Sequence, residues 1–545
     1  MSIFAKDTSY TDADHKADVS VLHSLGYAQE LERRMSTFSN FAISFSIICI
    51  LSGGINSLAQ GIAGAGGAAI GIGWPLGCLI SGVFAIAMGQ IASAFPTAGG
   101  LYHWSSILGN RFTGWLTAWL NLLGLITVLG AINVGTWGFF AGSIAPWFDI
   151  VTDTTTAAGF RNQIVFVAVI TFAQALVNHF GIKTTAKLTD FSGYLIFATA
   201  IVLTLALFAF AAHWDISRLW TFANYSGDPT LNAANELKGD PIWPNKVSGL
   251  MVFLLGLLLP IYTITGYDAS AHTAEETHKA ALAAPRGMVS SVLWSSVFGY
   301  LMLVAFVLAI PNMDDAAKQG WNVFFWTLDG TLPVWLKNVL YVAIFVSQLL
   351  CGLATVTSAS RMMYAFARDG GLPFSSVLKK VSASHRTPAA AIWTASVAAV
   401  LFVWGASMIT IQGASAYSIV VSCTVIFIFF SFAVPISLAV LAYGDTWTKM
   451  GPWDLGKPLF CLFGILSVIA AIFIFFVGVQ PPNDWALVIT VGFVVLAGLI
   501  WKLFEEKRFQ GPPIGDMIEK RKGEIAAAEQ AVGEAPATGG LPETA

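Results

Sequence analysis

The stretch LPIYTITGYDASAH, at residues 259–272, interrupts an apolar run that begins near Val247. A helix that crosses the hydrocarbon core of a bilayer must satisfy its backbone hydrogen-bonding groups within the protein. Pro260 removes a backbone donor, Gly266 weakens the helix, and Asp268 places a carboxylate beside the interruption. We therefore predict a broken membrane helix whose unpaired backbone faces protein or a cavity.

Composition indicates a membrane protein. Of the 545 residues, 56% are hydrophobic and 11% are charged, whereas a soluble domain carries about 25% charged residues. The class predicted is an all-α polytopic membrane protein. The net charge of −3 gives no reason to expect a nucleic-acid partner. The five cysteines all lie in apolar runs, which predicts free thiols: Cys49, Cys78, Cys351, Cys423 and Cys461.

Twelve apolar segments are long enough to span a bilayer, which takes about 20 helical residues each. They run roughly over 37–62, 73–95, 112–145, 161–181, 188–212, 247–272, 287–310, 333–366, 388–406, 414–441, 457–479 and 484–504. With the N-terminus placed in the cytoplasm, 22 of the 28 Lys and Arg residues fall on the cytoplasmic side. Because basic residues favour that side, we predict a multi-pass protein of the cell membrane with both termini cytoplasmic.

A second break lies in the first apolar segment, at Ser52, Gly53, Gly54 and Ile55. Backbone N–H groups that are freed beside the start of a half-helix attract a carboxylate. Close helix packing is the alternative, since small residues line helix interfaces in membranes. Interrupted helices at matching places in two halves of a chain point to a transporter's binding site. We therefore favour substrate binding at these four residues.

The break near residue 264 complements the first. Carbonyls freed near Tyr262, Thr263 and Ile264, beside Gly266, are candidates to accept hydrogen bonds from a substrate ammonium group. Tyr267 either closes over the substrate as an aromatic gate, or stacks on a cation, or fills the core.

Asp268 is the most informative single residue, since a carboxylate within a membrane segment is functional by default. It is a candidate coupling group. The alternative is that it caps the second half-helix and orders the break; no neighbouring base is evident to complete a proton relay, which favours this ordering role.

His272 either carries a proton or is a hydrogen-bonded structural residue. Glu275 and Glu276 are expected on the cytoplasmic side, paired with nearby Arg or Lys.

Thr355 and Ser358 share a face of the eighth segment at i, i+3 spacing. With carbonyls of the first helix, their hydroxyls form a candidate Na⁺ site; hydrogen bonds back to their own helix are the alternative.

The chain has no Gly-Lys-Thr or Gly-Lys-Ser motif, no zinc-spaced His and Cys set and no nucleophile elbow. We therefore expect neither an enzyme nor an ATP-driven pump, and no cofactor or metal beyond a coupling ion, H⁺ or Na⁺.

Four stretches carry a resemblance to a known superfamily: GYAQEL at 26–31, AFPTAGGLY at 94–102, GYDASAHTAEET at 266–277 and SRMMYAFARDGGLP at 360–373. The chain resembles the amino acid–polyamine–organocation superfamily, and is most similar to the amino acid/choline transporter family of GABA and choline permeases and bidirectional amino acid transporters. The resemblance implies a leucine-transporter-like fold, with two inverted five-helix repeats, broken helices 1 and 6 and two extra helices. It also implies that the first-helix glycine stretch holds a substrate carboxylate and that the sixth-helix carbonyls hold the amino group.

Under this resemblance the chain divides into six parts. They are the cytoplasmic N-terminal tail (1–35), the first repeat (36–212), an extracytoplasmic loop (213–246), the second repeat (247–441), helices 11 and 12 (442–504) and the cytoplasmic C-terminal tail (505–545). The last part is charged and then rich in Ala, Gly and Pro, which predicts disorder. Its final residues, LPETA at 541–545, resemble a sortase tag remnant or arise by chance.

Two departures from the superfamily bear on energy coupling. Gln90 stands where many members have Glu, and the fifth-helix lysine of several proton-coupled or ion-independent members falls near Ile196 here. The lysine that replaces a sodium ion is therefore absent, and the coupling ion stays open between H⁺ and Na⁺.

We predict a secondary transporter for a small amino acid or amine, with GABA and zwitterionic amino acids first. A polyamine or choline carrier is the alternative within the class, although it would leave the first-helix amides without an anion. A channel is more distant, because the chain has no repeated filter sequence and no pore-lining acidic ring. A membrane enzyme is more distant still.

Overall fold

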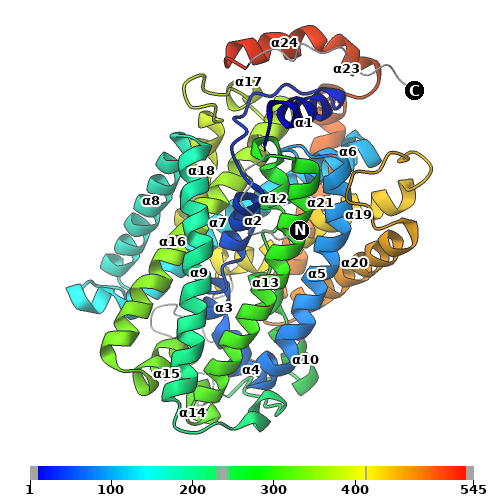
Figure 1. Ribbon diagram of the computed structural model, residues 1–545. Helices are drawn as coiled ribbons and strands as arrows, with labels where there is room; N and C mark the ends of the chain where they lie inside the picture. Colours follow the sequence, from blue (N-terminus) through cyan, green and yellow to red (C-terminus); the bar gives the residue numbers. More distant parts are fainter. Residues whose placement is uncertain (1–9, 229–230, 232–241, 244, 412–413, 535–545) are drawn as a thin grey trace.

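The computed structural model describes residues 10–228, 231, 242–243, 245–411 and 414–534. These residues form a bundle of long helices (Figure 1). Eleven helices are long and apolar enough to cross a membrane, and Gly249–Thr263 is a shorter apolar helix. A two-stranded antiparallel hairpin, β1 (Thr410–Ile411) with β2 (Ala414–Ser415), joins two of the helices.

All twelve predicted segments correspond to helices, and the predicted all-α fold with broken helices 1 and 6 is confirmed. The first five segments are α2 (Thr37–Ile48) with α3 (Gly53–Asn56) and α4 (Leu58–Ala65); η1 (Ala69–Gly73) with α5 (Trp74–Ala94); α7 (Arg111–Ser143); α8 (Ala157–His179); and α9 (Ile182–Phe210). The next five are α10 (Gly249–Gly256) with α11 (Leu258–Thr263) and α12 (Ala269–His272); α13 (Ala280–Ala309); α16 (Val334–Arg368); α18 (Ala389–Ser407); and α19 (Ala416–Ala442). The last two are α20 (Lys457–Gly478) and α21 (Trp485–Ile500).

Short helices connect or flank these spans. They are α1 (Asp12–Ser24), α6 (Leu101–Leu108), η2 (Ala145–Phe148), η3 (Ile216–Leu219), η4 (Ala274–Glu276), α14 (Met313–Lys318), η5 (Gly320–Asn322), α15 (Val323–Thr331), α17 (Ser375–Leu378), η6 (Trp501–Glu505), α22 (Glu506–Arg508), α23 (Asp516–Lys520) and α24 (Lys522–Ala531). Polar caps set where two long helices begin. The hydroxyl of Ser36 accepts from the N–H of Ser39 ahead of α2, and Asn110 and Thr113 form a capping box ahead of α7.

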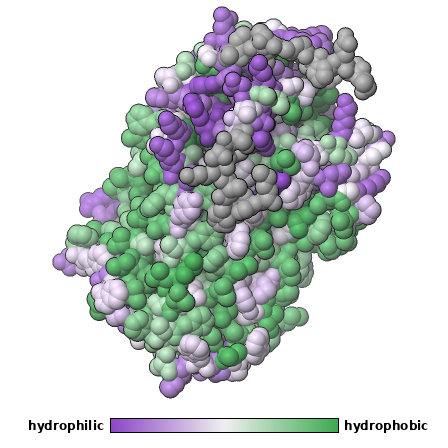
Figure 2. Space-filling model, viewed as in Figure 1, coloured by the Kyte–Doolittle hydropathy of each residue, from purple (hydrophilic) through white to green (hydrophobic). Residues whose placement is uncertain are grey.

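The outer surface of the bundle is apolar. Large side chains on α5, α9 and α20 are more than half exposed, among them Leu79, Leu205 and Ile472. Figure 2 shows hydrophobic residues over the middle and lower part of the visible face, with hydrophilic residues gathered near the end that carries α1 and α24. Soluble proteins rarely expose so large an apolar surface, and the chain is a multi-pass membrane protein.

The C-terminal tail is more ordered than the sequence predicts. Composition predicts disorder from residue 505, but residues 516–531 form α23 and α24, and α24 lies next to α1 (Figure 1). The carboxylate of Glu529 accepts hydrogen bonds from His23 Nε2 at 2.6 Å and from the N–H of Gln29 at 3.0 Å. Contacts with the N-terminal segment therefore hold a sequence that is too polar to fold alone. Residues 535–545, which include the LPETA stretch, lie outside the described part of the chain.

We expect Glu529→Ala to loosen this tail. Burial raises the pKa of Glu529, but the hydrogen bonds from His23 and Gln29 outweigh burial and leave that pKa below its usual 4.5. A carboxylate with a lowered pKa stabilises the docked tail above about pH 4.5, and this stabilisation is lost as the pH falls through the lowered value. At pH 7, trypsin should therefore cut the tail several-fold faster in Glu529→Ala. The exposed Glu524, changed to Ala in the same helix, serves as the control; equal cleavage of both variants would show that Glu529 does not hold the tail.

Candidate functional site at two broken helices

The first helix is interrupted between α2 and α3. Residues 49–52 leave the helical path, and Cys49 has a φ of 26°, which is uncommon outside glycine. The N–H groups of Ser52 and Gly53 both bond to the carbonyl of Cys49, at 2.7 and 3.1 Å. The predicted position of the break, residues 52–55, is therefore displaced, since the last three of these residues lie in α3. The glycine pair weakens a helix, but Cys49 makes the turn.

The break leaves donors unpaired. Among the residues that the structure describes, the N–H groups of Gly54 and Ile55 have no hydrogen-bond partner. Both lie in the first turn of α3, where the backbone dipoles point their positive ends toward an incoming anion. Of the four residues predicted to bind a carboxylate, these two keep a free donor.

The sixth helix is interrupted at residues 264–268, between α11 and α12. Pro260 sits in the first turn of α11, a position that tolerates a missing N–H. Gly266 has a φ of 84°, and a Cβ there would lie 2.2 Å from Ile47 Cγ2 on α2. Both the backbone angle and the close approach of α2 therefore require glycine.

This second break leaves acceptors unpaired. Within the described part of the chain, the carbonyls of Thr263 and Ile264 have no hydrogen-bond partner. The carbonyl of Tyr262 accepts from the hydroxyl of Thr265 at 2.7 Å. The free acceptors are thus at two of the three predicted positions.

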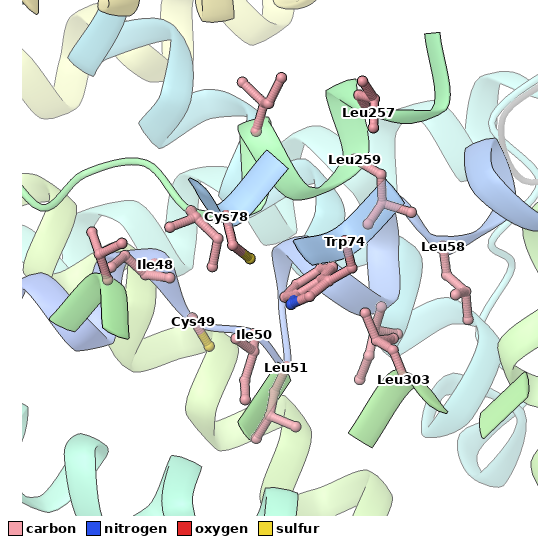
Figure 3. Packing of buried hydrophobic residues seen from close by; sticks show 14 of the residues in the cluster. Ile48, Cys49, Ile50, Leu51, Leu58, Trp74, Cys78, Leu257, Leu259 and Leu303 are labelled. Atoms are coloured by element: carbon pink, nitrogen blue, oxygen red, sulfur yellow. The ribbon is translucent and has the colours of Figure 1, made fainter. Parts of the chain in front are cut away.

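The two breaks face each other. A Cβ added to Gly53 would lie 3.0 Å from both Cα and Oγ1 of Thr263, so α3 and α11 approach each other closely at this glycine. Trp74 packs beside this junction with Ile50 and Leu303 (Figure 3). The unpaired donors of α3 and the unpaired acceptors that follow α11 therefore belong to one junction.

Partial exposure marks one more residue at this junction. Most residues around the breaks are buried, but Gly53, Asn56 and Tyr262 are half-buried. Asn56 is not predicted from the sequence. A Cβ on Gly135 of α7 would lie 2.6 Å from its amide nitrogen, so Gly135 makes room for it. Its position in the sequence, a polar residue directly after Gly53-Gly54-Ile55, could have indicated Asn56 as a candidate site residue.

Tyr267 is fully buried, and its ring centroid lies 5.3 Å from that of Phe432 on α19. Such packing fits a core side chain. Its hydroxyl, however, has no hydrogen-bond partner among the described residues. A buried hydroxyl without a partner is costly, so this group also fits a position that contacts a ligand.

The side chain of Asp268 makes no capping hydrogen bond to α12. Its Oδ2 accepts from Asn121 Nδ2 on α7 at 3.1 Å and lies 3.3 Å from His272 Nε2. A base is therefore present beside the carboxylate, contrary to the sequence analysis. The i, i+4 spacing of Asp268 and His272 could have indicated it, whereas Asn121 is distant in sequence and gives no such signal.

The two residues of the candidate Na⁺ site differ in their hydrogen bonding. The Thr355 hydroxyl donates to the carbonyl of Cys351 at 2.9 Å, one turn earlier in α16. The Ser358 hydroxyl has no partner among the described residues. The carbonyl of Leu51 in the first break accepts from Gln348 Nε2 at 2.9 Å. A carbonyl oxygen has two lone pairs, so this hydrogen bond does not decide for or against the Na⁺ site, which stays a prediction.

Buried ion pairs seal the end of the bundle that carries both tails, here called the tail end. Arg361 on α16 makes a bidentate pair with Glu276, 2.9 Å for each bond, and both side chains are fully buried. Arg368 pairs in the same way with Glu275, at 2.9 and 3.0 Å. The predicted pairing of these two glutamates with basic residues is confirmed. Arg33 adds a hydrogen bond of 3.0 Å to the carbonyl of Ala274.

The chain is similar to known membrane transporters over most of its length. A family model described as amino acid permease matches residues 35–500. The chain belongs to the amino acid permease family. The permease is 29% identical to the amino-acid permease BAT1 of Arabidopsis thaliana over 523 residues, which cover 90% of this chain and 95% of that protein. It is 26% identical to the GABA-specific permease of Saccharomyces cerevisiae, over 93% of this chain and 88% of the relative.

A third relative, amino-acid permease 2 of Neurospora crassa, is 25% identical over 93% of this chain and 90% of its own length. The permease is thus a transporter of amino acids, as the sequence predicts. In this family setting, the junction of the two broken helices is the candidate site for the transported amino acid.

Proposed function

We propose that the permease is a secondary transporter that carries a small zwitterionic amino acid, such as GABA, by alternating access around the junction of α3 and α11. The observation that supports this proposal best is the approach of the two breaks, 3.0 Å between a Cβ on Gly53 and Thr263 Cα. On one side of this contact the backbone offers donors, and on the other side it offers acceptors.

The free groups match the two ends of an amino acid. The N–H groups of Gly54 and Ile55 suit a carboxylate, because they donate from the positive end of a helix dipole. The carbonyls of Thr263 and Ile264 suit an ammonium group, because carbonyl oxygens only accept. Backbone groups on rigid half-helices fix the distance between the two charges, which selects for a short substrate.

A polyamine or choline carrier fits less well. A cation without a carboxylate would leave the Gly54 and Ile55 donors unpaired, and an unpaired buried donor costs about 1–3 kcal/mol. The carboxylate that follows the second break, Asp268, contacts Asn121 and His272.

We place the tail end in the cytoplasm, following the excess of Lys and Arg on that side. The buried ion pairs then close the cytoplasmic route to the junction. In the alternate state these pairs must separate, so that the substrate can leave toward the cytoplasm.

Two measurements test the proposal. In a thermal-shift screen of the purified permease, a zwitterionic amino acid should raise the melting temperature, since a ligand of the folded state alone must stabilise it. Choline and polyamines should not. In proteoliposomes, uptake of that amino acid should saturate and show counterflow; uptake that is linear in concentration and lacks counterflow would indicate a channel and reject the proposal.

Gly53→Val should abolish uptake. The branched side chain would force α3 away from the Thr263 backbone, and a displacement of about 1 Å can lower a rate about 100-fold. Gly82→Val on α5 is the matched control, because nothing lies within 4 Å of a Cβ at that glycine. Normal uptake by Gly53→Val, with both variants folded, would show that the junction is not the transport site.

A further inference from the structure

Asp268 and His272 form a buried pair next to the second break. The side chains have exposed fractions of 2% and 0%. His272 Nδ1 lies 3.0 Å from the carbonyl oxygen of Ala98, in the segment between α5 and α6. A carbonyl oxygen only accepts, so Nδ1 carries a hydrogen. The other ring nitrogen, Nε2, lies 3.3 Å from Asp268 Oδ2 but makes no hydrogen bond within the described residues.

Two polar atoms of this buried pair, His272 Nε2 and Asp268 Oδ1, have no hydrogen-bond partner among the described residues. A neutral His272 with its hydrogen on Nδ1 presents a lone pair at Nε2, and an ionised Asp268 presents a lone pair at Oδ2. Because Asp268 Oδ2 already accepts from Asn121, the buried acceptors left without a donor are His272 Nε2 and Asp268 Oδ1. One added proton turns one of the pair's acceptors into a donor, either on Nε2 in an ion pair or on the carboxyl group in a neutral pair.

The surroundings supply a hydrogen-bond donor to Asp268 Oδ2 but no positive charge among the described residues. From α7, Asn121 donates to Oδ2, and from α19 the hydroxyl of Ser431 lies 3.3 Å from the same Asn121 nitrogen. Tyr267 is a titratable neighbour on the same segment. It is fully buried, and a protonated phenol carries no charge, so it does not compensate the charge of Asp268. Among the described residues, no Lys or Arg pairs with Asp268.

The pair is also connected to the tail-end seal through one residue, Ala98. The carbonyl of Ala98 accepts from His272, and the N–H of Ala98 donates to Glu275 Oε1 at 2.9 Å. Glu275 is the partner of Arg368 in the seal. Movement of α12 that opens the seal would therefore also pull His272 and Asp268 away from Ala98 and Asn121.

We infer that Asp268 and His272 together hold the coupling proton of the permease, bound while the tail end is sealed and released when α12 moves. The inference rests on the proposed function, and names H⁺ as the second transported species. The proton enters from water on one side and leaves to water on the other, so no further reactant is needed.

Asp268→Asn and His272→Gln test this inference, because each variant keeps hydrogen-bonding groups but cannot hold the extra proton. The probe is the radiolabelled amino acid that stabilises the permease most in the thermal-shift screen. In proteoliposomes, an external medium one pH unit more acidic should raise accumulation by wild type up to about tenfold for each coupled proton. A pH dye should report proton entry with the substrate. Both variants should lose the stimulation and the proton entry, yet keep substrate exchange, since exchange returns a loaded carrier.

His103→Gln is the matched control. His103 is also buried, and burial lowers its pKa to about 3, so it binds no proton near neutral pH. It should keep the stimulation. Stimulation retained in Asp268→Asn and His272→Gln would overturn the inference, and exchange lost in both would assign the pair to ordering the break instead. Wild type that shows counterflow without proton entry would also overturn it, while leaving the proposed transport of an amino acid intact.

Discussion

Gly266→Ala is expected to abolish uptake and to lower the stability of the permease. Glycine at this position has a φ of 84°, and a Cβ would lie 2.2 Å from Ile47 Cγ2 and 3.0 Å from Ile47 Cβ. The left-handed backbone costs an alanine about 1–2 kcal/mol, and overpacking a core costs about 1–3 kcal/mol more. Since Ile47 belongs to the half-helix α2, relief of the overlap must move one broken helix away from the other.

Two further variants separate these costs. Gly456→Ala has a similar φ of 75° with nothing near its Cβ, so it reports the backbone cost alone. Ile47→Ala combined with Gly266→Ala removes the closest atom and should recover part of the stability. Melting temperature and uptake are measured on all three. If Gly266→Ala matches Gly456→Ala in stability and transports normally, α2 does not need its close approach to the second break.

Arg361→Leu should be the second severe change. The side chains of Arg361 and Glu276 are fully buried and share two hydrogen bonds of 2.9 Å. Removal of one partner from a buried pair costs about 3–5 kcal/mol, because the remaining charge is left uncompensated. The seal at the tail end then opens or the protein unfolds, and in either case accumulation of substrate should fail.

A double-mutant cycle decides how much of this loss belongs to the ion pair. Arg361→Leu with Glu276→Leu removes both charges and should be more stable than Arg361→Leu alone, as judged by melting temperature. The exposed pair of Lys318 and Asp315 provides the comparison, and Lys318→Leu should change little. If the double variant is no more stable than the single one, the packing of Arg361 matters and its charge does not.

The sequence predicts that both helices are broken, because proline and glycine each destabilise a continuous helix and a carboxylate is costly to bury in a membrane. It places the second break correctly, at Gly266, where the backbone angle leaves little choice. It misplaces the first, because the turn is made by a left-handed Cys49, and no local rule favours cysteine in that conformation. Gly53 is needed for a different reason, its contact with Thr263, which lies on a distant helix.

Partners from other helices are the part that could not be predicted. Asn121 reaches Asp268 from α7, and Gln348 reaches the carbonyl of Leu51 from α16. Each joins residues more than a hundred positions apart, so the sequence shows the polar residue without its partner. The order of the C-terminal tail has the same origin, since composition measures what a segment can bury alone and α24 is held through α1 and the residues that follow it.

The contacts of the N-terminal segment also fix the order in which the molecule can be assembled during synthesis. Gln29 and His23 bind Glu529, about 500 positions later, and the N–H groups of Arg34 and Met35 bind the carbonyl of Glu276. A ribosome adds roughly 5–20 residues each second, so the first residues made must wait tens of seconds for partners made near the end. Every helix is in place before the N-terminal segment can complete its docking. A nascent permease therefore passes through a stage in which the junction of the two broken helices exists but the tail end is still unfinished, and a ribosome that stalls before residue 529 leaves the chain at that stage.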